Sequence, residues 1–240
     1  MRVAQAANDT PPRRPPVAGE TPLDFTAEES RKPVNSDPGS QLQVAVLAAG
    51  ASRRFGSPKQ LVRIDGRPLL HRAVANAVAV GGHAVTVVLG SGASGLTALL
   101  RHSPASVLVN RDWAEGIGSS LRAAATSLPG ACDGLMVVLA DQVAVTPEDL
   151  RRLATAWRTR PDSIVAAAYA GVTGVPAVFP RWTFPALTGL RGDEGARLLL
   201  RRFADRVLRL PMPNAELDID TPEDLLAVEP ARRPGDPSTA

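Results

Sequence analysis

Short segments that are apolar almost throughout alternate along this chain with segments whose apolar residues recur at helical spacing. The apolar segments include residues 44–47, 85–89 and 135–140, and helical spacing is clear over residues 68–80. A strand that is apolar on both sides has to be covered on both sides, which is typical of a mostly parallel sheet between two layers of helices. We therefore expect a three-layer α/β/α fold, in which ligands bind beyond the carboxyl ends of the strands.

The remaining elements continue this alternation. Further strands are expected at residues 107–109, 164–168, 177–179 and 207–210, and further helices at residues 95–102, 119–128 and 196–203. Thr146 is suited to cap a helix that begins at Pro147, because its hydroxyl can accept a backbone N–H and proline fits the first helical position. Thr221 and Pro222 repeat this arrangement near the end of the chain.

Two terminal segments differ from the rest in composition. Residues 1–40 contain seven prolines and few apolar residues, and residues 229–240 are similar. Because such segments cannot bury enough surface to offset the entropy cost of ordering, we expect both to be disordered. A Pro-rich docking segment is the alternative for residues 1–40. Residues 41–228 are expected to form the folded domain.

The composition excludes several functional classes. A formal net charge of +3 and 4% aromatic residues provide neither the basic field nor the stacking platform typical of nucleic-acid binding. The single cysteine, Cys132, excludes an internal disulfide, and the three histidines lack metal-ligand spacing. Because the sequence shows neither a signal-peptide pattern nor a run of about 20 apolar residues, we expect a cytoplasmic protein without a membrane partner.

Lys59 is the only lysine between residues 41 and 228, in a chain that uses arginine for nearly every other positive charge. It lies in the loop after the first expected strand, where Ala48, Ala49 and Gly50 let the backbone approach a ligand closely. Its compact, mobile ammonium differs from a planar guanidinium. Lys59 and Arg54 make this loop a candidate triphosphate site, although it matches no Walker A or G-x-G-x-x-G pattern. A glycine-containing turn with surface arginines is the alternative.

Three aspartates are candidate metal ligands. Asp141 directly follows the apolar segment 135–140, so its carboxylate is expected at the carboxyl edge of the sheet. Asp218 and Asp220 flank Ile219 in an extended segment, so both should point to one side. Carboxylates beside a phosphate loop supply the hard oxygen ligands that Mg²⁺ takes together with substrate phosphates. A loop cap at Asp141 and a solvated turn at the other two positions are the alternatives.

Five motifs occur in the order and spacing typical of one family. They are L-A-A-G-x-S-x-R-F-G-x-x-K-Q-L at residues 47–61, N-x-x-W-x-x-G with S-S-L at 110–121, A-D-Q at 140–142, G-D-x-G-A-R at 192–197 and D-I-D-T-P-E-D-L at 218–225. Through them, residues 43–228 resemble the MobA-like NTP transferase family. Within it, the greatest similarity is to the molybdenum cofactor cytidylyltransferases, the MocA-like group.

The resemblance implies a Rossmann-like nucleotidyltransferase fold of the GT-A-like type, and a transfer reaction. CMP would pass from CTP to the terminal phosphate of molybdenum-molybdopterin, releasing pyrophosphate and forming molybdopterin cytosine dinucleotide. A phosphate nucleophile is already anionic, so positioning and charge neutralisation by Mg²⁺, Lys59 and Arg54 would suffice. The implied partners are CTP, the molybdopterin acceptor and, in transient contact, a recipient molybdoenzyme or its maturation factor.

The same resemblance implies roles for individual residues. Base and ribose would contact Leu47, Ala48, Ala49 and Gly50; the triphosphate would contact Arg54 and Lys59; Mg²⁺ would bind Asp141 and one or both of Asp218 and Asp220; and the pterin would face Asn110, Ser119 and Ser120. Lys59, Arg54 and Asp141 would be the catalytic residues. In this family a Leu-Ala-Ala-Gly start accompanies cytidine selection, so Ala49 favours CTP. Val143 replaces the proline that usually follows Asp-Gln, which removes a rigid turn.

Three other functions remain open. Residues 90–95 fit G-x-G-x-x-G after an expected strand, and Asp112 follows at about the distance of a ribose-binding acid, a pattern typical of NAD(P)-dependent oxidoreductases. That fingerprint normally follows the first strand of the fold, however, and here it follows the second. A molybdenum cofactor carrier, or a nucleotidyltransferase acting on another phosphorylated acceptor such as a sugar phosphate, is compatible with the same residues.

Overall fold

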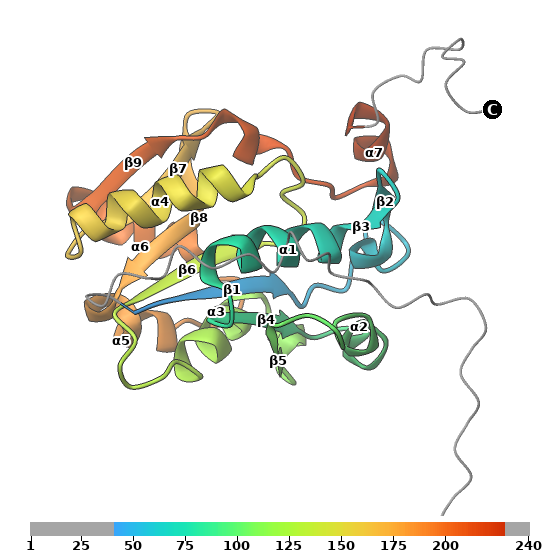
Figure 1. Cartoon of the computed structure of the whole chain (residues 1–240), viewed down its shortest axis with the longest axis horizontal. Helices are drawn as coiled ribbons and strands as arrows, with labels where there is room; N and C mark the ends of the chain where they lie inside the picture. Colours follow the sequence, from blue (N-terminus) through green and yellow to red (C-terminus); the bar gives the residue numbers. More distant parts are fainter. Residues whose placement is uncertain (1–40, 229–240) are drawn as a thin grey trace, which may run out of the picture.

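The chain folds around one seven-stranded sheet. A computed structural model describes residues 41–228, and the expectations for residues 1–40 and 229–240 lie outside this range. The strands are β1 (Leu42–Ala48), β4 (Val85–Leu89), β5 (Ser106–Val109), β6 (Gly134–Leu139), β7 (Ile164–Tyr169), β8 (Val172–Pro180) and β9 (Val207–Pro211). Their order is β5-β4-β1-β6-β8-β7-β9, and only β8 runs antiparallel to its neighbours (Figure 1). The predicted mostly parallel sheet is confirmed.

Helices cover both faces of the sheet (Figure 1). One face packs against α1 (Leu69–Gly81) and α4 (Pro147–Thr159), and the other against α3 (Ile117–Thr126), α5 (Phe184–Thr188) and α6 (Ala196–Arg202). The helix α2 (Ala93–Leu99) packs beside β4, and α7 (Pro222–Val228) ends the described part of the chain. The three-layer α/β/α architecture expected from the apolar strands is therefore confirmed.

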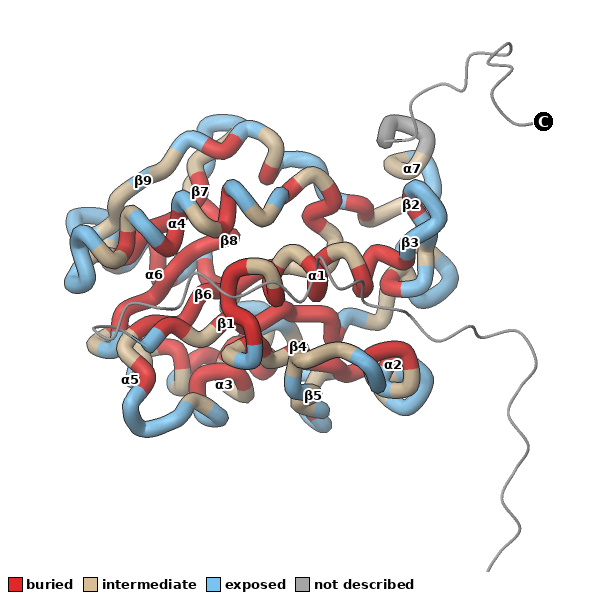
Figure 2. The backbone as a smooth tube through the Cα atoms, in the orientation of Figure 1, coloured by how far each residue is buried: buried red, intermediate tan, exposed pale blue. Residues whose placement is uncertain are grey.

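Strand β1 shows why its sequence is apolar throughout. Val44 and Val46 belong to the core shared with α1 and α4, whereas Ala45 and Leu47 belong to the core shared with α3 and α6. The strand is buried along most of its length (Figure 2). Full burial of a valine or leucine side chain contributes about 1.5–3 kcal/mol to folding. Burial on both faces places β1 inside the sheet, between β4 and β6. The loop that follows β1 therefore begins at the carboxyl edge of the sheet.

The predicted cap of α4 is confirmed. The Thr146 hydroxyl accepts the Asp149 N–H at 3.2 Å, and the Asp149 carboxylate accepts the Thr146 N–H at 3.0 Å. Asn214 also donates to this carboxylate, at 2.6 Å. Burial alone would raise the pKa of Asp149, but these hydrogen bonds to its charged form lower it below the ordinary value. The capping box thus fixes the start of α4 and attaches it to the segment that follows β9.

The structure differs from the sequence-based boundaries in several places. The helix α2 lies at Ala93–Leu99 rather than 95–102, and α3 begins at residue 117 rather than 119. Strand β8 covers Val172–Pro180, where only 177–179 was expected, because its glycine and proline obscure the strand pattern. The helix α5 and a hairpin of β2 (Arg63–Ile64) and β3 (Arg67–Pro68) were not predicted, although the Asp-Gly pair between these two strands is a hairpin signal.

Among residues 41–228, no helix is both long enough and apolar enough to cross a lipid bilayer.

Candidate functional site

The carboxyl ends of β1 and β6 open into a pocket of about 420 Å³, which we call the first pocket. Its walls come from the loop after β1, from residues 113–120 and from the end of β6. The lining residues are Leu47, Ala48, Ala49, Gly50, Ala51, Ser52, Arg53, Lys59, Gln60, Leu69, Trp113, Ala114, Glu115, Gly116, Ile117, Ser120, Leu139, Ala140, Asp141 and Asp193. The pocket thus lies at the edge of the sheet where ligands of such folds bind.

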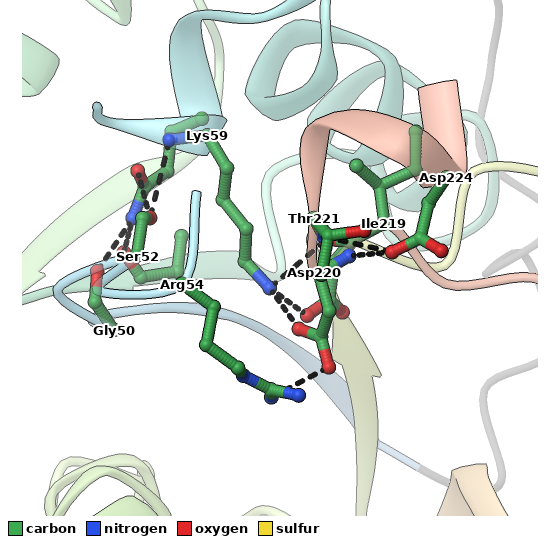
Figure 3. A network of polar contacts seen from close by, with 11 residues as sticks. Gly50, Ser52, Arg54, Lys59, Ile219, Asp220, Thr221 and Asp224 are labelled. Atoms are coloured by element: carbon green, nitrogen blue, oxygen red, sulfur yellow. Dashed lines mark hydrogen bonds and ion pairs between the residues drawn. The ribbon is translucent and has the colours of Figure 1, made fainter. Parts of the chain in front are cut away.

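The loop after β1 is held in shape by two side chains. Ser52 adopts a positive φ of 53°, and its hydroxyl accepts the Lys59 N–H at 3.1 Å (Figure 3). The Gln60 amide, which is 4% exposed, donates to the carbonyls of Ala48 at 3.1 Å and Gly50 at 2.9 Å. These bonds tie Gln60 to the backbone on both sides of Ala49. Sequence reasoning recognised Gln60 only as part of a motif, because its partners are set by the path of the loop.

The ammonium of Lys59 lies between two carboxylates. Its Nζ donates to Asp141 Oδ2 at 2.6 Å, to Asp220 Oδ1 at 3.0 Å and to the Ile219 carbonyl at 3.2 Å (Figure 3). The Lys59 side chain is only 17% exposed. Burial lowers its pKa, but the charge of Asp141 and the hydrogen bonds to both carboxylates raise it by more, so the pKa lies above the ordinary 10.5. Lys59 therefore carries its positive charge at the mouth of the pocket at neutral pH.

The two arginines of the loop lie in different places. Arg54 donates to Asp220 Oδ2 at 2.7 Å, and its side chain is 72% exposed, at the rim rather than in the first pocket (Figure 3). Arg53, to which the sequence motif gives no role, lines the pocket. Both arginines belong to the loop after β1. Arg53 lines the first pocket directly, whereas Arg54 is connected to it only through Asp220, which also binds Lys59.

Asp141 and Asp220 meet because two distant segments pair. The Ile219 N–H donates to the Asp141 carbonyl at 3.2 Å, and Gln142 forms an antiparallel bridge with Asp218. Ile219 is fully buried in a small core with Val143, which takes the place of the expected proline and packs there with 8% exposure. The turn after Asp141 is therefore held by this packing and by the strand-like pairing.

The carboxylates offer a partial metal site. Asp141 keeps one buried oxygen, Oδ1, without a hydrogen-bond partner, and Asp220 lies across the Lys59 ammonium from it. Within residues 41–228, no group of three or more His, Cys, Asp or Glu side chains could hold a metal ion. Two carboxylates fit Mg²⁺ when the remaining ligands are water and substrate phosphate oxygens. The donor set thus fits a divalent ion that arrives with a phosphorylated ligand.

Asp218 lies apart from this pair. It is exposed and lines a second pocket next to the first, rather than the first pocket itself. Although the residue as a whole is exposed, partial desolvation of its carboxyl raises its pKa, and the negative charges of Asp141 and Asp220 raise it further. Because Ile219 between them is buried, Asp218 and Asp220 both point away from the core, but Asp218 faces the second pocket whereas Asp220 contacts Lys59.

Asn110 and the two serines of the 110–120 segment are mutually bonded. The Asn110 amide donates to the hydroxyls of Ser119 at 2.8 Å and Ser120 at 3.1 Å, and its oxygen accepts the Asp112 N–H at 3.0 Å. Asn110 and Ser119 are buried, and only Ser120 of the three lines the first pocket. The cluster joins the end of β5 to the start of α3 and so shapes the loop between them.

The glycine-rich segment 90–95 packs behind this loop. A side chain at Gly90 would come within 2.5 Å of the Trp113 Cβ and 2.7 Å of the Ala49 carbonyl oxygen. Ser91 donates its N–H to that carbonyl at 3.1 Å. None of residues 90–95 lines the first pocket, and the helix α2 that they open is seven residues long. In this structure the glycines permit close packing of Trp113, which itself lines the pocket.

A salt-bridged clasp joins the loop before α3 to the loop before α6, at the wall of the first pocket that both form. Glu115 accepts from Arg122 at 3.0 and 2.5 Å and from the Gly192 N–H at 3.0 Å. Arg122 also donates to the Leu190 carbonyl at 2.8 Å. The Arg122 hydrogen bonds, followed by the Gly192 N–H, lower the pKa of Glu115 from 4.5 to about 2. Sequence reasoning missed this clasp, because its partners lie in different motifs.

Comparisons with known proteins agree on the family. The model of the MobA-like NTP transferase domain matches residues 44–207. The nicotine blue oxidoreductase of Paenarthrobacter nicotinovorans is 34% identical over 65% of this chain and 80% of its own length. The purine catabolism protein PucB of Bacillus subtilis is 30% identical over 74% of this chain and 91% of its own length.

Solved structures of similar proteins have the same fold as this chain. The crystal structure of Rv0371c from Mycobacterium tuberculosis has a TM-score of 0.69 and 30% identity, covering 79% of this chain and 97% of that one. A second structure of that protein, a complex with manganese, has a TM-score of 0.66 and 28% identity, with the same coverage. The match over nearly the whole length of these chains supports the Rossmann-like nucleotidyltransferase fold expected from the sequence motifs.

Proposed function

This chain belongs to the family of MobA-like NTP transferase domains, and from that premise we propose that it transfers CMP from CTP to the terminal phosphate of molybdenum-molybdopterin. The observation that carries the proposal is the position of Lys59 Nζ, 2.6 Å from Asp141 and 3.0 Å from Asp220 at the mouth of the first pocket. A mobile cation between two carboxylates, beside an open loop, suits the binding of a metal-bound triphosphate.

In the proposed reaction an oxygen of the acceptor's terminal phosphate attacks the α-phosphorus of CTP. The bond from the α-phosphorus to the bridging oxygen breaks, and pyrophosphate leaves with the bonding electrons. No general base is needed, because the attacking phosphate is already an anion. Lys59 and Arg53 neutralise the triphosphate, Arg54 holds Asp220, and the backbone of residues 48–51 carries the nucleoside.

Asp141 and Asp220 are the residues that would hold Mg²⁺, with Asp141 Oδ1 the unpartnered donor. When bound, the ion supplies Lewis-acid stabilisation of the charge on the phosphate oxygens. The manganese complex of the mycobacterial relative supports a divalent ion in this family. When the ion and the nucleotide bind, the Lys59 ammonium would leave Asp141 and Asp220 and bind phosphate oxygens instead.

The test is pyrophosphate release by the purified full chain with Mg²⁺ and molybdenum-loaded molybdopterin, comparing CTP, GTP and ATP. We expect release with CTP and its loss, by roughly 100-fold or more, in Asp141→Asn, because a charge that acts on the transition state is removed. The matched control is Asp205→Asn, at an exposed position of the 3-10 helix Ala204–Arg206. Release that persists in Asp141→Asn would remove this carboxylate from the reaction.

Base selection has its own test. Ala49 is 7% exposed and lines the first pocket, and in this family glycine at the equivalent position of the motif accompanies guanosine. We therefore expect Ala49→Gly to raise pyrophosphate release with GTP relative to CTP. An unchanged ratio of the two rates would show that base choice lies elsewhere in the pocket.

A second candidate, an NAD(P)H-dependent oxidoreductase, is favoured by one observation. The relative that is 34% identical over 166 residues is described as a nicotine blue oxidoreductase. Against it, residues 90–95, the only dinucleotide fingerprint in the sequence, do not line the first pocket. Binding of NADPH without Mg²⁺, detected by the change in its fluorescence and prevented by CTP, would favour this candidate over nucleotidyl transfer.

A further inference from the structure

Three exposed arginines lie at the C-terminal end of α6 and in the short helix that follows it. Arg201 and Arg202 are in the last turn of α6, and Arg206 ends the 3-10 helix Ala204–Arg206. Within residues 41–228, none of the three has a carboxylate at ion-pair distance. Asp205, the acidic residue between them, is exposed as well, so this part of the surface stays positively charged.

Two half-buried aromatic rings lie beside these arginines. Trp182 and Phe203 meet edge to face, with their ring centroids 5.0 Å apart. The guanidinium carbon of Arg206 lies 4.7 Å from the centroid of the Trp182 ring. That of Arg202 lies 5.3 Å from the centroid of the Phe203 ring. The Trp182 Nε1 donates to the Asp162 carbonyl at 3.0 Å, which holds the indole in place. We call Trp182, Arg202, Phe203 and Arg206 the arginine–aromatic surface.

A surface of this kind fits an acidic segment that also carries an aromatic side chain. Exposed ion pairs strengthen binding by at most about fivefold each, so carboxylates alone would hold such a segment weakly. A third ring packed edge to face against the two rings adds a contribution of similar size. Guanidinium groups can donate to carboxylates while their planes lie over aromatic rings, so the two kinds of contact are compatible at one place.

The chain itself contains such a segment in residues 20–29, E-T-P-L-D-F-T-A-E-E. It carries four acidic residues and no basic one, together with Leu23 and Phe25. Phe25 is the only aromatic residue within residues 1–40. The basic residues of that part of the chain lie on either side, at positions 2, 13, 14, 31 and 32. Residues 20–29 therefore complement the arginine–aromatic surface in charge and in side-chain type.

The beginning of the folded domain lies next to this surface. Gln41 donates its N–H to Asp133 Oδ2 at 2.9 Å, and its carbonyl accepts the Asp133 N–H at 2.8 Å. The Asp133 carbonyl accepts the N–H of Arg181, the residue before Trp182, at 2.8 Å. Because β1 and β8 lie on the two sides of β6, this connection crosses two strand spacings, or about 10 Å.

The chain that precedes Gln41 is long enough for the contact. The eleven residues 30–40 can span about 35–40 Å when extended, several times the distance across two strands. A tether of this kind gives an effective concentration of the order of 1 mM. A contact that dissociates at about 0.1 mM between separate molecules would then be formed in about 90% of the molecules.

We propose that residues 20–29 bind the arginine–aromatic surface of the same molecule, with Phe25 against the two rings and the carboxylates beside Arg202 and Arg206. The inference is independent of the proposed function, because none of the four surface residues lines either pocket. The surface lies instead where β1 and β6 begin, at the edge of the sheet opposite the first pocket.

The experiment measures cleavage of the full chain by a protease specific for glutamate. Residues 20–29 contain its sites Glu20, Glu28 and Glu29, and a synthetic peptide of residues 16–34 gives the rates for the same bonds without the domain. We expect cleavage to be roughly tenfold slower in the full chain than in the peptide, as about 90% occupancy implies. The masses of the fragments identify the bonds. Equal rates in the two would overturn the proposal.

Two variants locate the contact. Phe25→Ala removes no contact within residues 41–228, and it should abolish most of the protection from cleavage. Arg202→Glu combined with Arg206→Glu should do the same, with the melting temperature as a check on folding. The matched control, Arg101→Glu combined with Arg111→Glu, changes exposed arginines near the β5 edge of the sheet and should keep the protection. Protection that survives the change at Arg202 and Arg206 would refute the assignment of the surface.

Dilution separates binding within one molecule from binding to a second copy. Protection within one molecule should not depend on protein concentration, whereas its loss on dilution would show that the segment binds another copy and would overturn the proposal. Added salt should weaken the protection, because exposed ion pairs are screened. Protection that is insensitive to salt would contradict the role of the carboxylates.

Discussion

In the absence of a ligand, the Lys59 ammonium lies where a cation neutralises Asp141 and Asp220, at 2.6 and 3.0 Å from their oxygens. In this position it would compete with a divalent ion for the same carboxylates. A metal ion that arrives alone has to displace a bonded ammonium, whereas one that arrives on a triphosphate brings new partners for it. Binding of ion and nucleotide should accordingly be coupled through this residue.

Replacing Lys59 by methionine tests the coupling. We expect Lys59→Met to bind Mn²⁺ without nucleotide roughly tenfold more tightly than the wild type, because a unit positive charge beside the carboxylates is removed. The readout is the electron paramagnetic resonance signal of free Mn²⁺. The same variant should lose pyrophosphate release by about 100-fold. Equal Mn²⁺ affinity in both proteins would show that Lys59 does not compete with the ion.

Gln60 acts on the first pocket through the backbone. Its amide bonds to the Ala48 and Gly50 carbonyls, and Gln60→Leu would leave both without that donor. We expect a loss of about 1–3 kcal/mol in the free energy of unfolding, as for other buried polar groups left unpaired. The KM for CTP should rise more than kcat falls, because the loop rather than the reacting phosphate is disturbed. Urea unfolding and steady-state kinetics measure the two effects, and an unchanged KM would contradict this positioning role.

At the scale of elements, Glu115 joins the loop before α3 to the loop before α6. Its carboxylate joins Arg122, in α3, to the Gly192 backbone, and Gly118 donates its N–H to the Gly192 carbonyl at 2.9 Å. These two loops form part of the wall that separates the two pockets. The clasp therefore fixes part of the wall that the two pockets share.

The clasp makes a prediction about acid stability. The pKa of Glu115 falls from 4.5 to about 2 on folding, so its contribution is present above pH 4.5 and is lost as the pH falls toward 2. We expect Glu115→Gln to be less stable than the wild type at pH 7 and to lose less stability between pH 5 and about 2. Thermal melts across this range provide the measurement. Glu223→Gln, at an exposed position in α7, is the control, and parallel profiles for all three proteins would exclude the clasp as a source of the pH dependence.

At the scale of the whole molecule, the first pocket is built from segments that are far apart in the chain. The loop after β1 supplies Lys59, the end of β6 supplies Asp141, and the segment before α7 supplies Asp220. A ligand that binds these three groups at once should stabilise the entire domain. By mass action, saturation at 100 times the dissociation constant adds about 2.7 kcal/mol.

Thermal melts with CTP and Mg²⁺ test this prediction. We expect the melting temperature to rise with CTP and Mg²⁺ together by more than the sum of the rises with each alone. Asp220→Asn should remove this excess, because one of the two carboxylates can then no longer bind the ion. A simple sum of the separate effects in the wild type would indicate that ion and nucleotide bind independently.

The sequence by itself determined the layers of the fold, the cap of α4 and the position of Asp141 at the carboxyl edge. These follow from local patterns: apolar runs, helical spacing and a threonine before a proline, each of which acts within a few residues. The placement of Lys59 in the loop after the first strand is of the same kind. The family resemblance came from motifs whose members are likewise close together.

Only the tertiary structure decided which of these residues meet. The pairing of residues 141–142 with residues 218–219 brings Asp220 to Lys59, turns Asp218 into the second pocket and leaves Arg54 at the rim. Nothing local encodes this pairing, because its register is set by burial of Ile219 against Val143 and by the antiparallel strand β8 beside β6. Side chains that alternate along a strand change sides with a one-residue shift, so the final arrangement depends on the packed core.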